Sequence, residues 1–332
     1  MTPGALLPAL SIACALLFMA SVLTGPAALG IGDSLRALIA GGEGPLPLIM
    51  REIRLPRALL AVLVGASLGL SGAAVQGLLR NPLAEPGLIG VSSSAALGAV
   101  LAIQTGAAAT FALMLPLAGL AGAAAGATLV LLLAGRGGYG RGDNFALILA
   151  GIAVSSLGGA LTSLVLNLAP NPFAASEIVF WMMGSLADRS WPDVWTALPL
   201  MLLGWTVLML SAGDLDALTL GEDAAASLGV DLPGLRLRVI LGVAASVGAA
   251  TSVAGAIGFV GLVVPHLLRR AVGGVPSRLL PAAAIGGAAL VLAADIAVRV
   301  ILPERDLKLG VMTALVGAPV FLHLIHRVRR GA

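Results

Sequence analysis

Residues 58–79 read ALLAVLVGASLGLSGAAVQGLL, an uncharged run between Arg57 and Arg80. A hydrocarbon core about 30 Å thick is crossed by roughly 20 helical residues, so this run is long enough to span a membrane. Similar runs flank it at about 6–23, 88–108, 111–134, 145–168, 194–212, 237–256, 257–268, 279–300 and 308–326. The sequence therefore predicts an all-α membrane protein with about ten transmembrane helices. The run 257–268 is short enough to be a half-span buried against its neighbours.

Composition supports this prediction. The 332 residues are 59% hydrophobic and 11% charged, with a mean hydropathy of +1.05, whereas an ordinary soluble domain carries roughly a quarter charged residues. So few charges cannot cover a soluble chain of this size. We expect residues 1–332 to form a single transmembrane domain. The first run is expected to be a retained helix rather than a secretion signal, because no Lys or Arg precedes it and further spans follow.

Cysteine and lysine each occur only once in the chain, and their scarcity excludes several functions. Cys14 is the only cysteine, so the chain can form neither an intramolecular disulfide nor a thiolate metal cluster. Lys308 is the only lysine, which excludes a G-x-x-x-x-G-K-[ST] phosphate loop. If ATP drives this protein, another subunit hydrolyses it. The arginines are spread through short loops, which indicates topology signals and contacts with membrane lipid rather than nucleic-acid binding.

The basic residues give a weak orientation. If the ten spans alternate and both termini lie in the cytoplasm, eleven of the 19 basic residues are cytoplasmic and eight are external. The cluster Arg51, Arg54 and Arg57 then lies on the side that the positive-inside rule disfavours. Either the topology is wrong there, or these arginines have an external function.

Six segments together resemble one known family. They are residues 54–98 (from RLPRALLAVL to VSSSAALG), LILAGIAVSSLGGALTS (147–163), VFWMMGSLA (179–187), LTLGEDAAASLGV (218–230), VAGAIGFVGLVVPHLLR (253–269) and LGVMTALVGAPVFLHLI (309–325). In this order they resemble the FecCD family of permeases, which includes importers of iron siderophores, haem and vitamin B12. The resemblance implies the type II ABC importer permease fold.

It also implies the assembly and its partners. Two copies of the chain would form a pathway through a bacterial inner membrane, and a periplasmic binding protein would deliver the chelate. Two ATPase subunits would bind ATP and Mg and hydrolyse the nucleotide, so this chain is expected to be a transport subunit, not an enzyme, and to bind no cofactor or metal. Ferric siderophores are the expected cargo, with haem or cobalamin as the alternative.

The family pattern implies a docking role for three arginines. Arg54 and Arg57 flank Pro56 in RLPR, and Arg299 ends LAADIAVR. Arginine suits the binding of acidic groups because its planar fork holds carboxylates bidentately and stays charged. The alternative is that these side chains extend to lipid headgroups.

The turn NPLAEPG at 81–87 interrupts two apolar runs with two prolines and a glycine, which no continuous helix accommodates. By resemblance, Asn81 and Leu83 are candidates for the cytoplasmic gate, with Asn144 before the fifth span. A rigid capped turn without a gating role is the alternative. Ser94 stands where the family has glycine, so the local backbone packing is expected to differ there.

The fifth span carries hydroxyl groups on an otherwise apolar helix. Ser155, Ser156, Thr162 and Ser163 resemble the wall of the family's pathway. Hydroxyls can also bond carbonyls of their own helix, so a purely structural role is the alternative. The span has no Lys, Arg, Asp or Glu, which favours a weakly binding cavity over a high-affinity ion site.

Residues 213–236 form the longest polar stretch between late spans. LGEDAAASLGVDLPGLR predicts a short helix that starts near Gly221, with acids in its first turn. By resemblance this is the cytoplasmic segment that couples to the ATPase, with Glu222, Ala225, Leu228 and Gly229 as contacts. An ordinary surface loop is the alternative.

The remaining polar residues have simpler interpretations. Asp295 is the one acid within a span and needs a partner, which Arg299 can supply one helical turn away. An ion-coupled secondary transporter is the remote alternative, because such a protein places ionisable groups near mid-membrane. Lys308 replaces a proline of the family pattern and, with Arg305, is expected to contribute to docking. Three histidines lie near the ends of predicted helices and are expected to be at the membrane–water interface: His266, His323 and His326.

Overall fold

The computed structural model describes residues 3–25, 30–40, 44–111, 113–135, 143–301 and 307–331, and every element in these ranges is helical. Seven helices are long and apolar enough to cross a membrane within the described ranges. They include α1 (Pro3–Leu23), α4 (Leu55–Leu78), α6 (Met114–Gly135), α7 (Asp143–Asn167), α9 (Trp191–Leu210), α12 (Leu232–Ala254) and α14 (Pro276–Ile301). The other predicted spans correspond to α5 (Val91–Gln104), α13 (Val260–Arg269) and α15 (Leu309–Gly331). The prediction of an all-helical membrane protein is confirmed.

The half-span predicted at 257–268 is a broken span. α12 ends at Gly255, where a φ of 71° takes the backbone out of the helix, and α13 begins after Phe259, also at positive φ. Residues 255–259 between the two helices are not helical. Irregular backbone at membrane depth is tolerated where protein or a cavity covers it. Here the amide of Ser185 covers the α12 end by donating to the carbonyl of Ala254 at 2.8 Å.

The structure adds short helices that hydropathy did not predict. They are α2 (Ile31–Ala40), α3 (Pro45–Leu48), the π-helical turn η1 (Ile49–Arg54), α8 (Pro172–Met182) and α10 (Ala212–Leu218). A hydropathy search finds runs that can cross a membrane, and these segments are too short for that. The short helix predicted near Gly221 is present as α11 (Glu222–Ser227), with Gly221 as its N-cap.

Helix α4 is the centre of the molecule, and glycines let its neighbours approach it closely. A Cβ atom added to Gly65 or Gly69 would overlap the backbone of α14 at Gly287 and Ala283. A Cβ on Gly72 would overlap α13 at Gly261. Small residues allow this approach where lipid provides no hydrophobic driving force between helices. Gly65 and Gly69, four residues apart on one face of α4, therefore let α14 pack directly against it.

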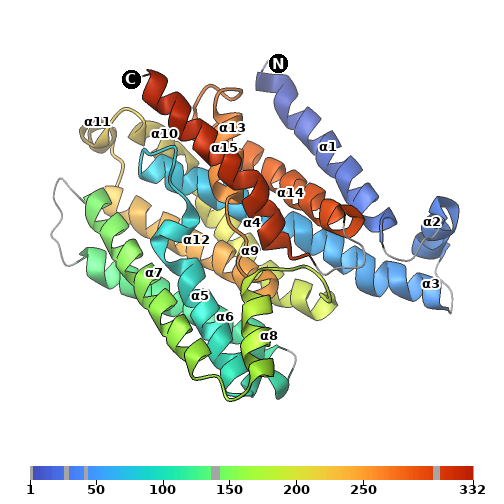
Figure 1. Ribbon diagram of the computed structural model, residues 1–332. Coiled ribbons are helices and arrows are strands. Elements are labelled where there is room, and N and C mark those ends of the chain that lie inside the picture. The colour runs from blue at the N-terminus through green and yellow to red at the C-terminus, as the bar shows by residue number, and fades with distance from the viewer. Residues whose placement is uncertain are drawn as a thin grey trace.

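The helix directions place both termini at one end of the molecule. α14 begins beside α10, where the amide of Ser277 donates to Asp216 at 2.8 Å, and ends beside the last turn of α1, where Arg299 donates to Ser21. α1 therefore runs parallel to α14 and starts at the α10 end, and α15 returns to that end. Figure 1 shows N and C at its upper edge and places α10 and α11 far from α2 and α3. Which end faces the cytoplasm stays a prediction.

Candidate functional site

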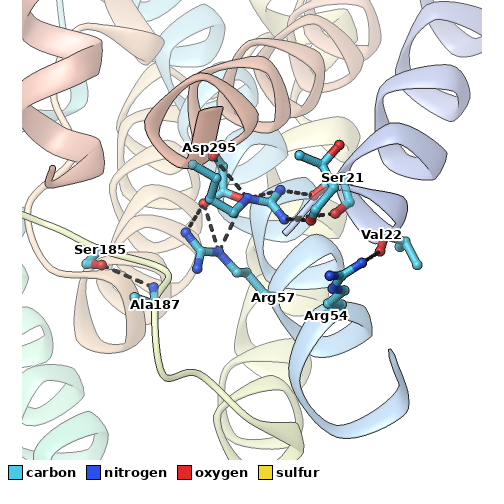
Figure 2. A network of polar contacts seen from close by, with 9 residues as sticks. Ser21, Val22, Arg54, Arg57, Ser185, Ala187 and Asp295 are labelled. Atoms are coloured by element: carbon cyan, nitrogen blue, oxygen red, sulfur yellow. Dashed lines mark hydrogen bonds and ion pairs between the residues drawn. The ribbon is translucent and has the colours of Figure 1, made fainter. Parts of the chain in front are cut away.

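A buried carboxylate organises the end of the molecule away from α11. Asp295 is fully buried and accepts from Arg57 Nε at 3.0 Å and from Arg57 Nη2 at 2.8 Å (Figure 2). Arg299 Nη2 lies 2.8 Å from its other oxygen. The predicted Asp295–Arg299 pair is confirmed, and the structure adds Arg57 as a second partner. No sequence signal indicated this contact, because the two residues are 238 positions apart.

The other two predicted docking arginines cap helix α1. Arg54 is buried and donates to the carbonyl of Leu23 at 2.9 Å, with the Val22 carbonyl at 3.4 Å (Figure 2). Arg299 donates to the carbonyls of Ser21 and Thr24 at 2.9 and 2.6 Å. The last carbonyls of a helix lack partners within it, and cationic donors also suit the negative end of its dipole. The structure thus brings the three arginines together but turns two of them toward α1.

The predicted gate turn is internally braced. Asn81 is exposed, and its side-chain oxygen accepts the amide of Leu83 at 2.9 Å. Leu83 itself is half-buried. This is the capped turn that the sequence left open as an alternative, and the gating role stays a prediction. Asn144 lies in the first turn of α7, and its side chain is outside the described residues.

The same turn is tied to the broken span. The Glu85 carboxylate accepts the amide of Phe259 at 3.0 Å, at the start of α13. Burial raises the pKa of Glu85, and the hydrogen bond from Phe259 opposes that shift. Gln76 on α4 donates to the Ala84 carbonyl at 3.2 Å and accepts from Arg269 at 2.7 Å. The sequence did not indicate the Glu85–Phe259 and Gln76–Arg269 contacts, which join residues 174 and 193 positions apart.

The four predicted pathway residues lie in three different settings. Thr162 and Ser163 line a cavity of about 370 Å³ that α7 shares with Ser92 and Ser93 of α5. Ser155 donates to the carbonyl of Gly87 at 3.2 Å and so ties α7 to the gate turn. Ser156 is exposed on the outer face of the chain, and Ser163, like other hydroxyls here, bonds its own helix.

A second pocket borders the first. It has a volume of about 560 Å³ and lies between α8 and α15. Met182 and Ala256 line both cavities, so the non-helical backbone of the broken span borders both. The residues lining the two cavities carry no formal charge. Such a surface can accommodate a bulky solute without binding it tightly.

At the opposite end, α10 and α11 are each held on the bundle by one ion pair. Glu222 lies 3.2 Å from Arg236, and Asp214 lies 2.6 Å from Arg238, so α10 and α11 are both tied to α12. Leu228 is 66% exposed. The next residue, Gly229, turns the chain at a φ of 88°, a backbone conformation that glycine adopts readily.

One predicted coupling contact points inward. The Ala225 side chain is fully buried in the main hydrophobic core. Its small size lets α11 lie close to the bundle, and its methyl group is not presented to a partner. Of the predicted coupling residues, Leu228 and Gly229 are the exposed ones, while Glu222 is half-buried.

Most of the chain matches one known family. The model of the FecCD transport family matches residues 13–327. The chain belongs to the FecCD transport family. It is therefore a permease subunit of an ABC importer, and not itself an ATPase.

Three FecCD relatives differ in their named cargo. The hemin transport system permease protein HmuU of Yersinia pestis is 38% identical over 281 residues, which cover 85% of this chain and 84% of HmuU. The Fe(3+) dicitrate transport system permease protein FecD of Escherichia coli is 38% identical over 283 residues, covering 85% and 86%. The cobalamin import system permease protein BtuC of Halobacterium salinarum is 40% identical over 279 residues, covering 83% and 73%. The cargo is therefore not decided by similarity alone.

The fold of this FecCD permease has a solved counterpart. A metal-chelate type ABC transporter in an inward-facing conformation superposes with a TM-score of 0.85 and 32% identity, over 98% of this chain and 99% of that chain. The expected type II importer fold is thus confirmed.

Proposed function

We propose that this chain carries ferric siderophores through a bacterial inner membrane as the permease of an ATP-driven importer. The observation that carries the proposal is the match to FecCD permeases over most of the chain, together with relatives named for ferric dicitrate and hemin. The paired uncharged cavities support it, because a bulky chelate can pass such a surface without being trapped. Selectivity then resides in a periplasmic binding protein.

A second copy of the chain completes the pathway. Ser156, Ser163 and Asn167 are exposed on α7, a helix that otherwise presents leucines and isoleucines. Polar side chains that face lipid are unfavourable and are normally buried in protein or water-filled cavities. A second α7 facing the first across a wet pathway would cover them.

Two ATPase subunits drive the cycle from the cytoplasmic end. Residues 213–236 contain α10 and α11, and the ion pairs Glu222–Arg236 and Asp214–Arg238 connect them to α12. A displacement of α11 would thus be transmitted to a spanning helix rather than absorbed by a loose loop. Leu228 and Gly229 supply the exposed contact. ATP and Mg belong to those subunits.

The test is uptake of radiolabelled iron, supplied as a panel of ferric siderophores, by iron-starved cells with and without this gene. We expect loss of uptake for one chelate and recovery on re-expression. Unchanged iron uptake would contradict the siderophore assignment. Parallel arms with labelled haem and cobalamin then identify the alternative cargo.

The ion-coupled alternative is disfavoured by the surroundings of Asp295. Its carboxylate is held between Arg57 and Arg299, and it lies at the end of the bundle beside the last turn of α1. Both oxygens of this carboxylate are already engaged by arginines of the same chain, so it is poorly placed to hold a coupling ion. Reconstitution without the ATPase is expected to give no transport under any ion gradient.

A further inference from the structure

The three arginines at the end away from α11 are not equivalent. Arg54 and Arg299 donate to carbonyls of the last turn of α1, so moving either one would uncap that helix. For Arg57, the hydrogen bonds that the structure shows go to Asp295. Its side chain is also the more accessible, at 18% exposed against 6% for Arg299. Arg57 is therefore the arginine that can exchange its partner without disturbing α1.

Asp295 competes with a docking carboxylate for the guanidinium group of Arg57. Nε and Nη2 of Arg57 lie 3.0 and 2.8 Å from one carboxylate oxygen, and Nη2 belongs to both of the edges on which a guanidinium can hold a carboxylate with two hydrogen bonds. An acidic group from a partner can form such a paired contact once Asp295 has released Nη2. Docking at Arg57 is thus an exchange of one carboxylate for another.

The exchange is possible because Asp295 has a second partner. Removing the sole partner of a buried charge is strongly unfavourable. Asp295 keeps Arg299, 2.8 Å away through its other oxygen and one turn along the same helix. The buried carboxylate therefore stays compensated when Arg57 turns outward.

We infer that Asp295 is an internal competitor for Arg57, which weakens the docking of an acidic partner surface and speeds its release. This inference rests on the proposed docking of a periplasmic binding protein. It deepens that proposal by naming the residue that is exchanged and the residue that opposes binding. A transporter needs its delivery protein to leave after each cycle, and a built-in competitor supplies this without changing the partner.

The experiment measures dissociation of the transporter's own binding protein from the intact complex in lipid nanodiscs, by surface plasmon resonance at low salt. Asp295→Asn keeps the shape but loses the charge, and we expect roughly ten-fold slower dissociation, the effect of one charge-assisted contact. Arg57→Glu is expected to abolish binding. Glu52→Gln, an exposed acid at the same end, removes the same charge without releasing Arg57 and is expected to leave dissociation unchanged.

The outcomes separate the two proposals. If Arg57→Glu binds like the wild type, docking at this arginine is wrong. If Arg57→Glu loses binding but Asp295→Asn dissociates at the wild-type rate or faster, docking stands and the competitor role is overturned. If Asp295→Asn does not assemble, Asp295→Ser replaces it, because this change also removes the carboxylate that holds Arg57 and leaves the contacts of Arg299 with α1 in place. The same slower dissociation is expected from it.

Discussion

At the residue scale, the packing around Ser94 has a local explanation. Ser94 is buried on α5, and α6 presents Gly122 and Gly126 to it. A Cβ added at Gly126 would overlap the Ser94 side chain, and one at Gly122 would overlap its carbonyl. The extra hydroxymethyl group of serine is therefore accommodated by glycines on the facing helix.

This packing gives a reciprocal prediction. Gly126→Ala is expected to destabilise the folded protein by about 1–3 kcal/mol, the usual effect of overpacking, because its methyl group collides with Ser94. Ser94→Gly in the same chain should recover most of that loss. Thermal unfolding of the purified variants in detergent measures both. Equal destabilisation in the single and double variants would show that Ser94 is not the obstacle.

Glu85 supports a pH prediction. Folding raises the pKa of Glu85, so the protonated carboxyl favours the folded state. The stability that this protonated carboxyl contributes is fully present below the ordinary pKa of Glu85. That stability is lost as the pH rises through the raised pKa of the folded state. Glu85→Gln keeps an acceptor for the Phe259 amide and cannot ionise. We expect the stability of this variant not to fall as the pH rises. The variant should therefore be as stable as the wild type in acid and more stable than the wild type at neutral pH.

Glu85→Ala provides the matching control. It removes the acceptor, so the Phe259 amide at the start of α13 loses its partner at every pH, which costs about 1–3 kcal/mol. Melting temperatures from acid to neutral pH distinguish the variants. A wild-type profile in Glu85→Gln would show that another group causes the dependence.

At the element scale, α11 shows how a short helix becomes a rigid surface. Six residues cannot form a stable helix alone. Here Ala225 packs into the core, Glu222 pairs with Arg236, and glycines at both ends turn the chain. The element therefore presents Leu228 at a fixed position.

The prediction for this element concerns Leu228. Leu228→Asp places a carboxylate where the ATPase contact is expected, and burying an unpaired charge is unfavourable. We expect chelate uptake to be lost while the protein still reaches the membrane, as judged by immunoblotting of membrane fractions. Leu228→Met is the control and should transport normally. Normal uptake by the Asp variant would place the ATPase contact elsewhere.

At the scale of the whole molecule, the outer face of α7 predicts where the second copy lies. Cys14 is the only cysteine, so Cys14→Ser gives a cysteine-free background. In it, Ser163→Cys on α7 should cross-link between copies in membranes treated with a bifunctional thiol reagent. Leu16→Cys, on the exposed face of α1, should not. Cross-linking through α1 alone would place the interface on the other side of the molecule.

The sequence by itself determined the spanning helices, the α11 start at Gly221 and the Asp295–Arg299 pair. Each depends on hydropathy, capping or an i,i+4 spacing, which are properties of neighbouring residues. Only the tertiary structure decided that Arg57 shares Asp295, that Arg54 and Arg299 cap α1, and that Glu85 holds the broken span. These contacts join helices far apart in the chain. They follow from how closely glycine-bearing helices pack, which no local pattern in the sequence contains.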